Sequence, residues 1–387
     1  MNRTCQPTLI PASVVRITNI GALVGIATLL AGVIITPQRM WANLLLVSFL
    51  LVCIGLAGIV FIALTNVIGA AWSVAFRRVP EALTAALPFG AAGLLVTFLF
   101  HPSLYPWVAE HERLTGFRHL WLDYRFFLLR AVVYIVAWLW FSHAIVRNSL
   151  VQDADGDPGH SQRNARLSAA FLVVFAVTFW LASFDWIMSL EPDWSSTMFG
   201  IYNFAGMFSG GIAVLTLLVI WLERLGPLSG VINQEHLHDL GKMLFAFSTF
   251  WMYIWFSQYM LIWYAHLPEE TVYFAQRLHG NWEPLFILNL FLNWVVPFVI
   301  LMNRPAKRSS SVLAKVALVV LLGRWLDLYL MIMPSVDGRS PRVGVWEIGA
   351  IAGGAALFVT VFVRAFGKKS PVPIHDPGLM ESMHYHH

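Results

Sequence analysis

Ten long apolar runs divide this chain, and they constrain its fold more than any other feature. A helix needs about 20 mostly apolar residues to cross about 30 Å of hydrocarbon. With 58% hydrophobic residues, 12% charged residues and a mean hydropathy of +0.68, the 387-residue chain does not resemble a soluble domain. We predict membrane spans at residues 17–35, 44–75, 82–100, 124–146, 167–190, 197–222, 240–265, 282–302, 312–333 and 344–366.

The predicted fold class is an all-α integral membrane protein with ten transmembrane helices. Backbone groups in lipid must be satisfied within the segment, so the runs are expected to be helices, and the alternating pattern of a membrane barrel is absent from the sequence. The connections are short, and none could bury a core of its own. We therefore expect residues 1–366 to form a single transmembrane domain and any water-exposed redox centre to belong to a partner.

Basic residues in the connections predict the orientation. Lys and Arg concentrate on the side that holds both ends of the chain, including the tail 367–387. Cytoplasmic loops of membrane proteins carry this excess, so we predict both termini in the cytoplasm of a bacterium, with the helices in its cytoplasmic membrane. The net charge of +4 then reflects this bias, and we do not expect binding to nucleic acid.

Few residues are suited to holding a metal. Of thirteen histidines only His143 lies inside a predicted span, whereas membrane cytochromes hold haem between histidines on facing helices. The two cysteines, Cys5 and Cys53, are too few for an iron–sulfur cluster. The sequence therefore predicts that this chain carries no metal site of its own.

Two aspartates lie within apolar runs in matching frames. Asp185 precedes Pro192 by seven residues, and Asp327 precedes Pro334 by seven. An ionisable group inside a bilayer costs roughly 2.5–3.5 kcal/mol on insertion scales. The matching frames suggest a duplication in which spans 2–5 and spans 6–9 form two four-helix bundles, with spans 1 and 10 at the periphery.

Further polar residues fall at the same depth as these aspartates when each helix is measured at about 1.5 Å per residue. The predicted cluster lies in the outer third of the membrane and consists of Arg130, Asp185, Tyr202, Gln258, Glu283, Arg324 and Asp327. Intramembrane charges often mark proton or substrate paths. A second set, on the cytoplasmic side, would be a half-path through Asn66, His143 and Lys242. Alternatively, Arg130 pairs with Asp185 and Arg324 with Asp327 only to hold the bundle together.

Three segments carry a resemblance to a known family. They are LASFDWIMSLEPDWSSTMFGIYNFAGMFSGG (181–211), LGKMLFAFSTFWMYIWFSQYMLIWYAHLPEET (240–271) and LGRWLDLYLMIMP (322–334). These segments resemble the smaller NrfD-like, or polysulfide-reductase-like, membrane subunit of bacterial alternative complex III, a quinol:cytochrome c oxidoreductase. The resemblance implies ten helices, arranged as two four-helix bundles plus two peripheral helices.

The resemblance also implies partners and a role. The partners would be a larger NrfD-like membrane subunit, an iron–sulfur subunit, multihaem cytochrome c subunits and small membrane subunits. Haem c and iron–sulfur clusters would lie in those partners, while this chain would anchor the complex and contribute a proton path or a quinone-adjacent site. The resemblance leaves open whether this chain binds quinone or menaquinone.

Two other functions fit the same sequence. A secondary transporter could bind its solute at the membrane midplane, where such proteins often have broken helices; here only Pro297 interrupts the interior of a predicted span. A purely structural scaffold would use the buried charges for assembly alone. Copurification of haem c and iron–sulfur subunits would argue against the transporter.

Overall fold

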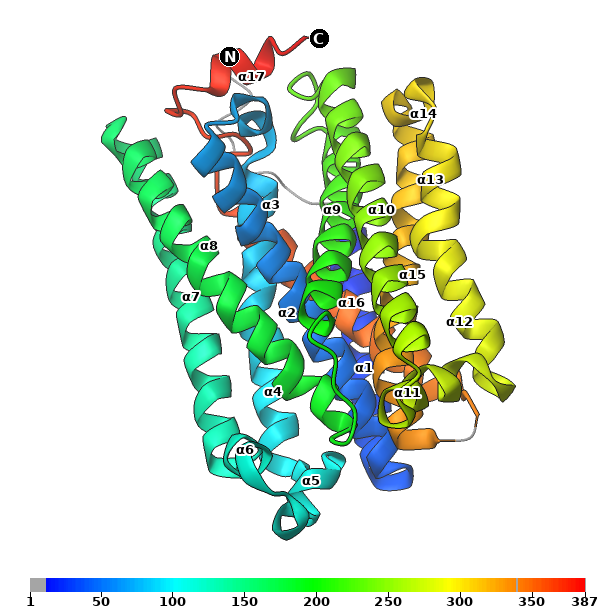
Figure 1. Ribbon diagram of the computed structural model, residues 1–387. Coiled ribbons are helices and arrows are strands. Elements are labelled where there is room, and N and C mark those ends of the chain that lie inside the picture. The colour runs from blue at the N-terminus through cyan, green and yellow to red at the C-terminus, as the bar shows by residue number, and fades with distance from the viewer. Residues whose placement is uncertain (1–11, 339, 387) are drawn as a thin grey trace.

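The computed structural model describes residues 12–338 and 340–386, which are helical throughout apart from turns and loops and include no strand. The long helices stand side by side in one bundle (Figure 1). They are α1 (Ala12–Ile35), α2 (Pro37–Ile68), α4 (Leu87–Phe100), α7 (Tyr124–Asp155), α8 (Gly159–Trp186), α9 (Phe199–Leu225), α10 (Gln234–Ala265), α15 (Ser310–Asp337) and α16 (Val345–Gly367).

Shorter helices connect or extend them. Towards one end of the bundle lie η1 (Ala71–Phe76), α3 (Arg78–Leu83), η2 (Thr84–Ala86), α14 (Arg304–Arg308) and α17 (Leu379–Met383). Towards the other lie η3 (Pro102–Leu104), α5 (Pro106–Ala109), η4 (His111–Arg113), α6 (Gly116–Trp121), η5 (Met188–Leu190), α11 (Pro268–Leu278) and η6 (Gly280–Trp282). We call these the α17 end, at the top of Figure 1, and the α11 end, at the bottom.

Within the described residues, nine helical segments are long and apolar enough to cross a membrane. The multi-pass, all-helical membrane architecture expected from the sequence is therefore present. The expected span at 240–265 is not among these nine segments. It forms the 32-residue helix α10, whose many Trp, Tyr and Ser residues lower its hydropathy although it lies beside α9 (Figure 1). A tenth crossing stays a prediction, as does the orientation of the termini.

The helices pack in two groups of four and a pair. One group contains α2, α4, α7 and α8, and the other contains α9, α10, the α12–α13 segment and α15. The two groups meet where α2 packs against α9 and α15. The pair is α1 with α16, which cross so closely that a Cβ on Gly25 would lie 2.3 Å from the Cα of Gly353. A side chain at either glycine would not fit, so the two glycines allow the helix backbones to approach closely.

Two span boundaries differ from the sequence-based expectation for identifiable reasons. Helix α2 ends at Ile68, not near residue 75, because Gly69 adopts the left-handed conformation (φ 65°) that terminates helices. The span expected at 282–302 is divided into α12 (Glu283–Leu290), a π-helical turn η7 (Phe291–Val295) and α13 (Val296–Leu301). The π turn ends two residues before Pro297, which cannot supply the helical N–H.

The two matched aspartate frames end differently, although both helices were expected to end near their prolines. Helix α8 ends at Trp186, whereas α15 continues through Pro334 to Asp337. Pro334 has no N–H for the carbonyl of Leu330, four residues earlier. Arg277 on α11 supplies the missing donor, with its Nε 2.8 Å from the Leu330 oxygen. This external hydrogen bond satisfies the carbonyl that Pro334 leaves free.

Candidate functional site

Asp185 lies in the last turn of α8 and accepts hydrogen bonds from α6 and α7. Arg130 donates from Nε to Oδ2 and from Nη2 to Oδ1, each over 2.8 Å. Trp121 donates from Nε1 to Oδ1 at 2.8 Å, and the Tyr134 hydroxyl donates to Oδ2 at 3.3 Å. Both charges are buried, with Asp185 1% and Arg130 6% exposed. Two parallel bonds from a guanidinium form a strong, directional pair with a carboxylate, so Arg130 neutralises Asp185.

Local structure fixes the position of Arg130. Asp123 caps the start of α7 by accepting a hydrogen bond from the Phe126 N–H at 2.9 Å, as short acidic side chains do at helix N-termini. Arg130 follows on the next turns, and its guanidinium carbon lies 4.1 Å from the Trp121 ring centroid and 4.4 Å from that of Phe126. Aromatic faces attract a guanidinium most when it is desolvated. The pair is therefore enclosed by aromatic rings.

Asp327 lies in α15 and accepts hydrogen bonds from four helices. Arg324, one turn earlier in α15, donates from Nη1 to Oδ2 at 2.6 Å. Trp251 on α10 donates to Oδ2 at 3.3 Å, and Asn289 on α12 donates to Oδ1 at 3.1 Å. The Tyr202 hydroxyl on α9 also donates to Oδ1. Asp327 and Arg324 are each 1% exposed, so this second charge pair is closed to bulk solvent.

The two carboxylates accept hydrogen bonds from different residues of the same types. Each accepts from one Arg, one Tyr and one Trp, and Asp327 accepts from an Asn in addition. The donors to Asp185 come only from neighbouring segments, α6 and α7. Those to Asp327 come from α9, α10 and α12 as well as α15 itself. The Asp327 site therefore depends on the packing of the whole second helix group, while the Asp185 site joins α8 to the neighbouring helices α6 and α7.

Two glycines of α9 make room for Arg324. A Cβ on Gly206 would lie 2.3 Å from the Arg324 Nη1, and a Cβ on Gly210 would lie 3.0 Å from its Cγ. The guanidinium also donates from Nη2 to the side-chain oxygen of Asn203, at 3.2 Å. The side chain of Arg324 thus lies along a strip of α9 that has no side-chain bulk.

A small cavity adjoins Asp327 on the side of the α11 end. Its volume is about 10 Å³, room for about one water molecule. Gln258 contributes to the lining together with Asp327, Tyr202 and Asn289. The Gln258 side chain is 3% exposed, and its amide nitrogen has no hydrogen-bond partner among the described residues. A water in this cavity would have the polar partners that a buried water requires.

A further ion pair borders this cavity. Arg277, whose side chain lines the cavity, is 1% exposed and donates from Nη2 to Oε1 of Glu191 at 2.7 Å. Its guanidinium carbon lies 3.5 Å from the ring centroid of Tyr273. The Glu191 side chain is 18% exposed. Polar groups therefore extend from Asp327 through the cavity to a carboxylate at the surface of the α11 end.

Four of the residues proposed from the sequence lie apart from these clusters. Glu283 begins α12, is exposed and takes no part in the hydrogen bonds to Asp327. His143 is exposed on α7, and Lys242 is exposed and pairs with an aspartate one turn earlier in α10. Asn66 is half-buried and donates to a serine of α8. Asn66 and Lys242 thus have different partners, and the three residues of the expected second half-path do not form one cluster.

Sequence reasoning did not identify several residues of the two sites. Trp121, Tyr134, Trp251 and Asn289 all donate to a buried carboxylate. Asn289 carried a usable signal, because an amide inside an apolar run needs a partner. Trp251 lies in the aromatic run at 250–264, where composition does not separate a hydrogen-bond donor from a packing residue.

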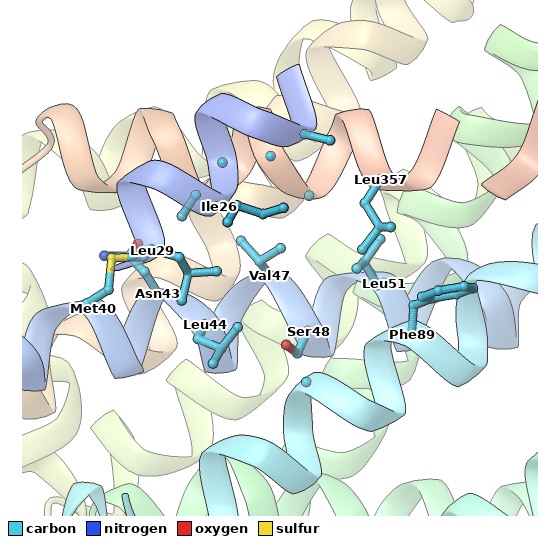
Figure 2. Close-up of a pocket in the computed structure, with 16 residues that line it drawn as sticks. Ile26, Leu29, Met40, Asn43, Leu44, Val47, Ser48, Leu51, Phe89 and Leu357 are labelled. Atoms are coloured by element: carbon cyan, nitrogen blue, oxygen red, sulfur yellow. The ribbon is translucent and has the colours of Figure 1, made fainter. Parts of the chain in front are cut away.

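A separate apolar groove lies between α1, α2, α4 and α16 (Figure 2). Its volume is about 230 Å³, and Asn43 and Ser48 supply the polar side chains of a lining that is otherwise apolar. No titratable residue lines it. The groove therefore offers no proton-exchange chemistry and is not part of the candidate site.

The described residues contain no group of three or more His, Cys, Asp or Glu side chains placed to hold a metal ion. Neither a known protein family nor a curated protein matches this chain. A functional assignment therefore depends on the buried charges, their hydrogen bonds and the adjoining cavity.

Proposed function

We propose that this chain is a membrane subunit of a quinol:cytochrome c oxidoreductase of the alternative complex III type. It would lie in a bacterial cytoplasmic membrane, cross it ten times with both termini in the cytoplasm, and adopt the NrfD-like fold. It would carry no metal of its own and contribute a proton path while anchoring the complex. Its partners would be a larger NrfD-like subunit, an iron–sulfur subunit, multihaem cytochrome c subunits and small membrane subunits.

The observation that supports this proposal best is the Asp327 site. A carboxylate surrounded by donors adjoins a cavity of one-water size, and Arg277 and Glu191 continue the polar groups towards the surface. Oxidation of a quinol releases protons, and a carboxylate in contact with water can accept and return them. In this proposal Asp327 accepts the proton, and a water in the cavity passes it on.

We assign Asp185 a different role. Its bidentate pair with Arg130 is enclosed by aromatic rings, and Asp185 does not line the cavity beside Asp327. A closed pair of this kind is better suited to holding α7 against α8 than to exchanging protons. Of the two matched aspartates, we propose Asp327 as the proton-exchanging group.

The cavity beside Asp327 does not fit a quinone. About 10 Å³ holds a single water, whereas a quinone ring is several times larger. Quinol oxidation would therefore take place in a partner subunit.

The test is the Asp327→Asn variant in the assembled complex, reconstituted in vesicles. We expect quinol:cytochrome c turnover and proton release to fall at least about tenfold, in line with the loss of a general acid–base group. Glu283→Gln is the matched control, because this exposed carboxylate has no bond to the site. Unchanged turnover and proton release in correctly assembled Asp327→Asn would refute the proton role.

Purification from the native membrane tests the assembly itself. Haem c and iron–sulfur subunits should copurify with this chain in fixed ratio. A protein that purifies alone and catalyses solute uptake in vesicles would instead identify a secondary transporter.

A further inference from the structure

The segment that follows α16 folds back across the α17 end of the bundle. We call residues 368–386 the strap; its α17 helix lies at the top of Figure 1. Its first contacts are with the first helix group. His375 Nδ1 lies 2.8 Å from the main-chain oxygen of Asp153 at the end of α7, and Asp376 forms an ion pair with Arg77.

The strap next contacts the turn after α2. The Ser382 hydroxyl donates to the carbonyl of Trp72 at 2.7 Å and accepts from the Ala75 N–H at 2.9 Å. Ser382 is fully buried. A serine that both donates to and accepts from the backbone of η1 fixes α17 at one position on that turn.

The strap ends on the second helix group. The Tyr385 hydroxyl donates to Oδ2 of Asp239 in α10 at 2.8 Å, and the Asn233 side chain donates to the Tyr385 carbonyl at 2.8 Å. Asn233 is also the N-cap of α10. The strap therefore connects α7 and η1 of the first group with the start of α10 in the second.

Buried charges lie beneath the strap. Arg78 pairs with both Glu81 and Asp153, and Ser149 donates to Glu81 at 2.6 Å. Arg78 and Glu81 are almost fully buried. Lys369 at the start of the strap lies beside this network: burial lowers the pKa of its ammonium, and Glu81 opposes that effect.

A buried histidine lies beneath the other part of the strap. His236 is fully buried, and its ring centroid lies 5.8 Å from that of Tyr385 and 6.1 Å from that of Phe76. The strap and η1 thus enclose His236 together.

The contacts of the strap are mostly polar. Its apolar side chains Ile374, Met380 and Met383 are exposed, and its apolar burial is limited to residues 371–373 and the half-buried Leu379. Polar contacts contribute little net stability because undocked groups bond to water instead, while ordering the backbone costs free energy at every residue. A segment held in this way undocks at lower cost than the helices it covers.

We propose that residues 368–386 form a detachable strap that ties the two helix groups together at the α17 end and closes that end to water. Docked, it keeps the Arg78–Glu81 network and His236 enclosed. Undocked, it exposes both while the helices stay folded. The proposal does not depend on the electron-transfer role and would hold equally for a transporter or a scaffold.

The test is hydrogen–deuterium exchange on the full-length protein in lipid nanodiscs. The release variant combines Ser382→Ala with Tyr385→Phe, which removes the hydroxyl contacts to η1 and α10. We expect amides of residues 76–82, 234–239 and 378–385 to exchange at least about tenfold faster than in the wild type, with α9 and α15 unchanged. Glu381→Gln, an exposed position on α17, is the matched control and should behave as the wild type.

Three results would overturn the proposal. In the first, the wild-type strap exchanges as fast as an unfolded chain, so it is not docked. In the second, the release variant leaves residues 234–239 as protected as before, so the strap does not cover them. In the third, α9 and α15 lose protection together with the strap, so the strap is part of the cooperative fold and does not detach. If the double variant expresses poorly, the same exchange measurement on the single variant Tyr385→Phe replaces it.

Discussion

Arg277 donates a hydrogen bond to the main-chain carbonyl of Leu330, which is the carbonyl that Pro334 leaves without a helical donor. The same guanidinium pairs with Glu191 and lies against the ring of Tyr273. Arg277 of α11 thus satisfies the carbonyl that the proline leaves free, and it also lines the cavity beside Asp327.

Replacing Arg277 should destabilise the protein through that carbonyl. Arg277→Met leaves the Leu330 oxygen and the Glu191 carboxylate unpaired, and we expect a loss of about 2–4 kcal/mol. Adding Pro334→Ala restores an N–H for Leu330, so the double variant should recover part of the loss. Unfolding free energies in detergent, arranged as a double-mutant cycle, measure this coupling. Strictly additive effects would show that the carbonyl is not the cause.

The Arg130–Asp185 pair should behave as a closed structural unit. Arg130→Met leaves a buried carboxylate without its cation and should cost about 3–5 kcal/mol, whereas Arg130→Met with Asp185→Leu should recover most of that. Arg125→Met on the same helix is the control, since Arg125 is exposed and should change stability by no more than about 0.5 kcal/mol. A double variant as unstable as Arg130→Met would contradict a purely structural pair.

The glycines beside Arg324 should differ in their tolerance of a methyl group. In Gly206→Ala the new carbon would meet the guanidinium at 2.3 Å and Asp327 Oδ2 at 3.2 Å, whereas in Gly210→Ala it would meet the aliphatic Cγ and Cβ of Arg324, at 3.0 and 3.3 Å. We expect Gly206→Ala to cost about 1–3 kcal/mol and Gly210→Ala less. Thermal unfolding ranks the two variants, and the reverse order would show that α9 shifts to relieve the contact.

Docking of the strap should weaken on acidification. Burial lowers the pKa of His236, and Asp239 and the carbonyls of Ser382 and Trp72 oppose that effect. A depressed pKa in the docked state means that this contribution is fully present above the ordinary value of 6.5 and is lost as the pH falls below it. A spin label at Met383→Cys should become more mobile as the pH is lowered from 7.5 to 5. The same label with His236→Gln should lose the pH response.

Docking should also weaken at high pH, through a different residue. Burial and the hydrogen bond to Asp239 raise the pKa of Tyr385 to about 12 from its ordinary value of 10.0. A raised pKa in the docked state means that the contribution is fully present below the ordinary value and is lost as the pH rises through about 12. Tyr385→Phe should abolish this alkaline release. A label that is released equally in both proteins would assign the effect to another group.

The sequence by itself determined the membrane class and the helical secondary structure of the chain. Long apolar runs have a transfer free energy that depends on their own composition, and a backbone in lipid has the helix as its local solution. This is why the membrane class, the helical character and the buried positions of Asp185 and Asp327 could be read from the chain, while helix ends such as that at Ile68 were displaced by a single glycine.

The tertiary structure decided which groups meet. Asp327 accepts from Tyr202, which is 125 residues away in the chain, and from Trp251 and Asn289 on two further helices. The matched aspartate frames diverge: α8 ends at Trp186, whereas α15 continues through Pro334, where Arg277 of α11 donates to the Leu330 carbonyl. Hydrogen bonds within a membrane depend on which helix faces which, and that follows from packing over the whole bundle. The sequence could therefore suggest the pairs Arg130–Asp185 and Arg324–Asp327, but not the uncharged donors that complete each site.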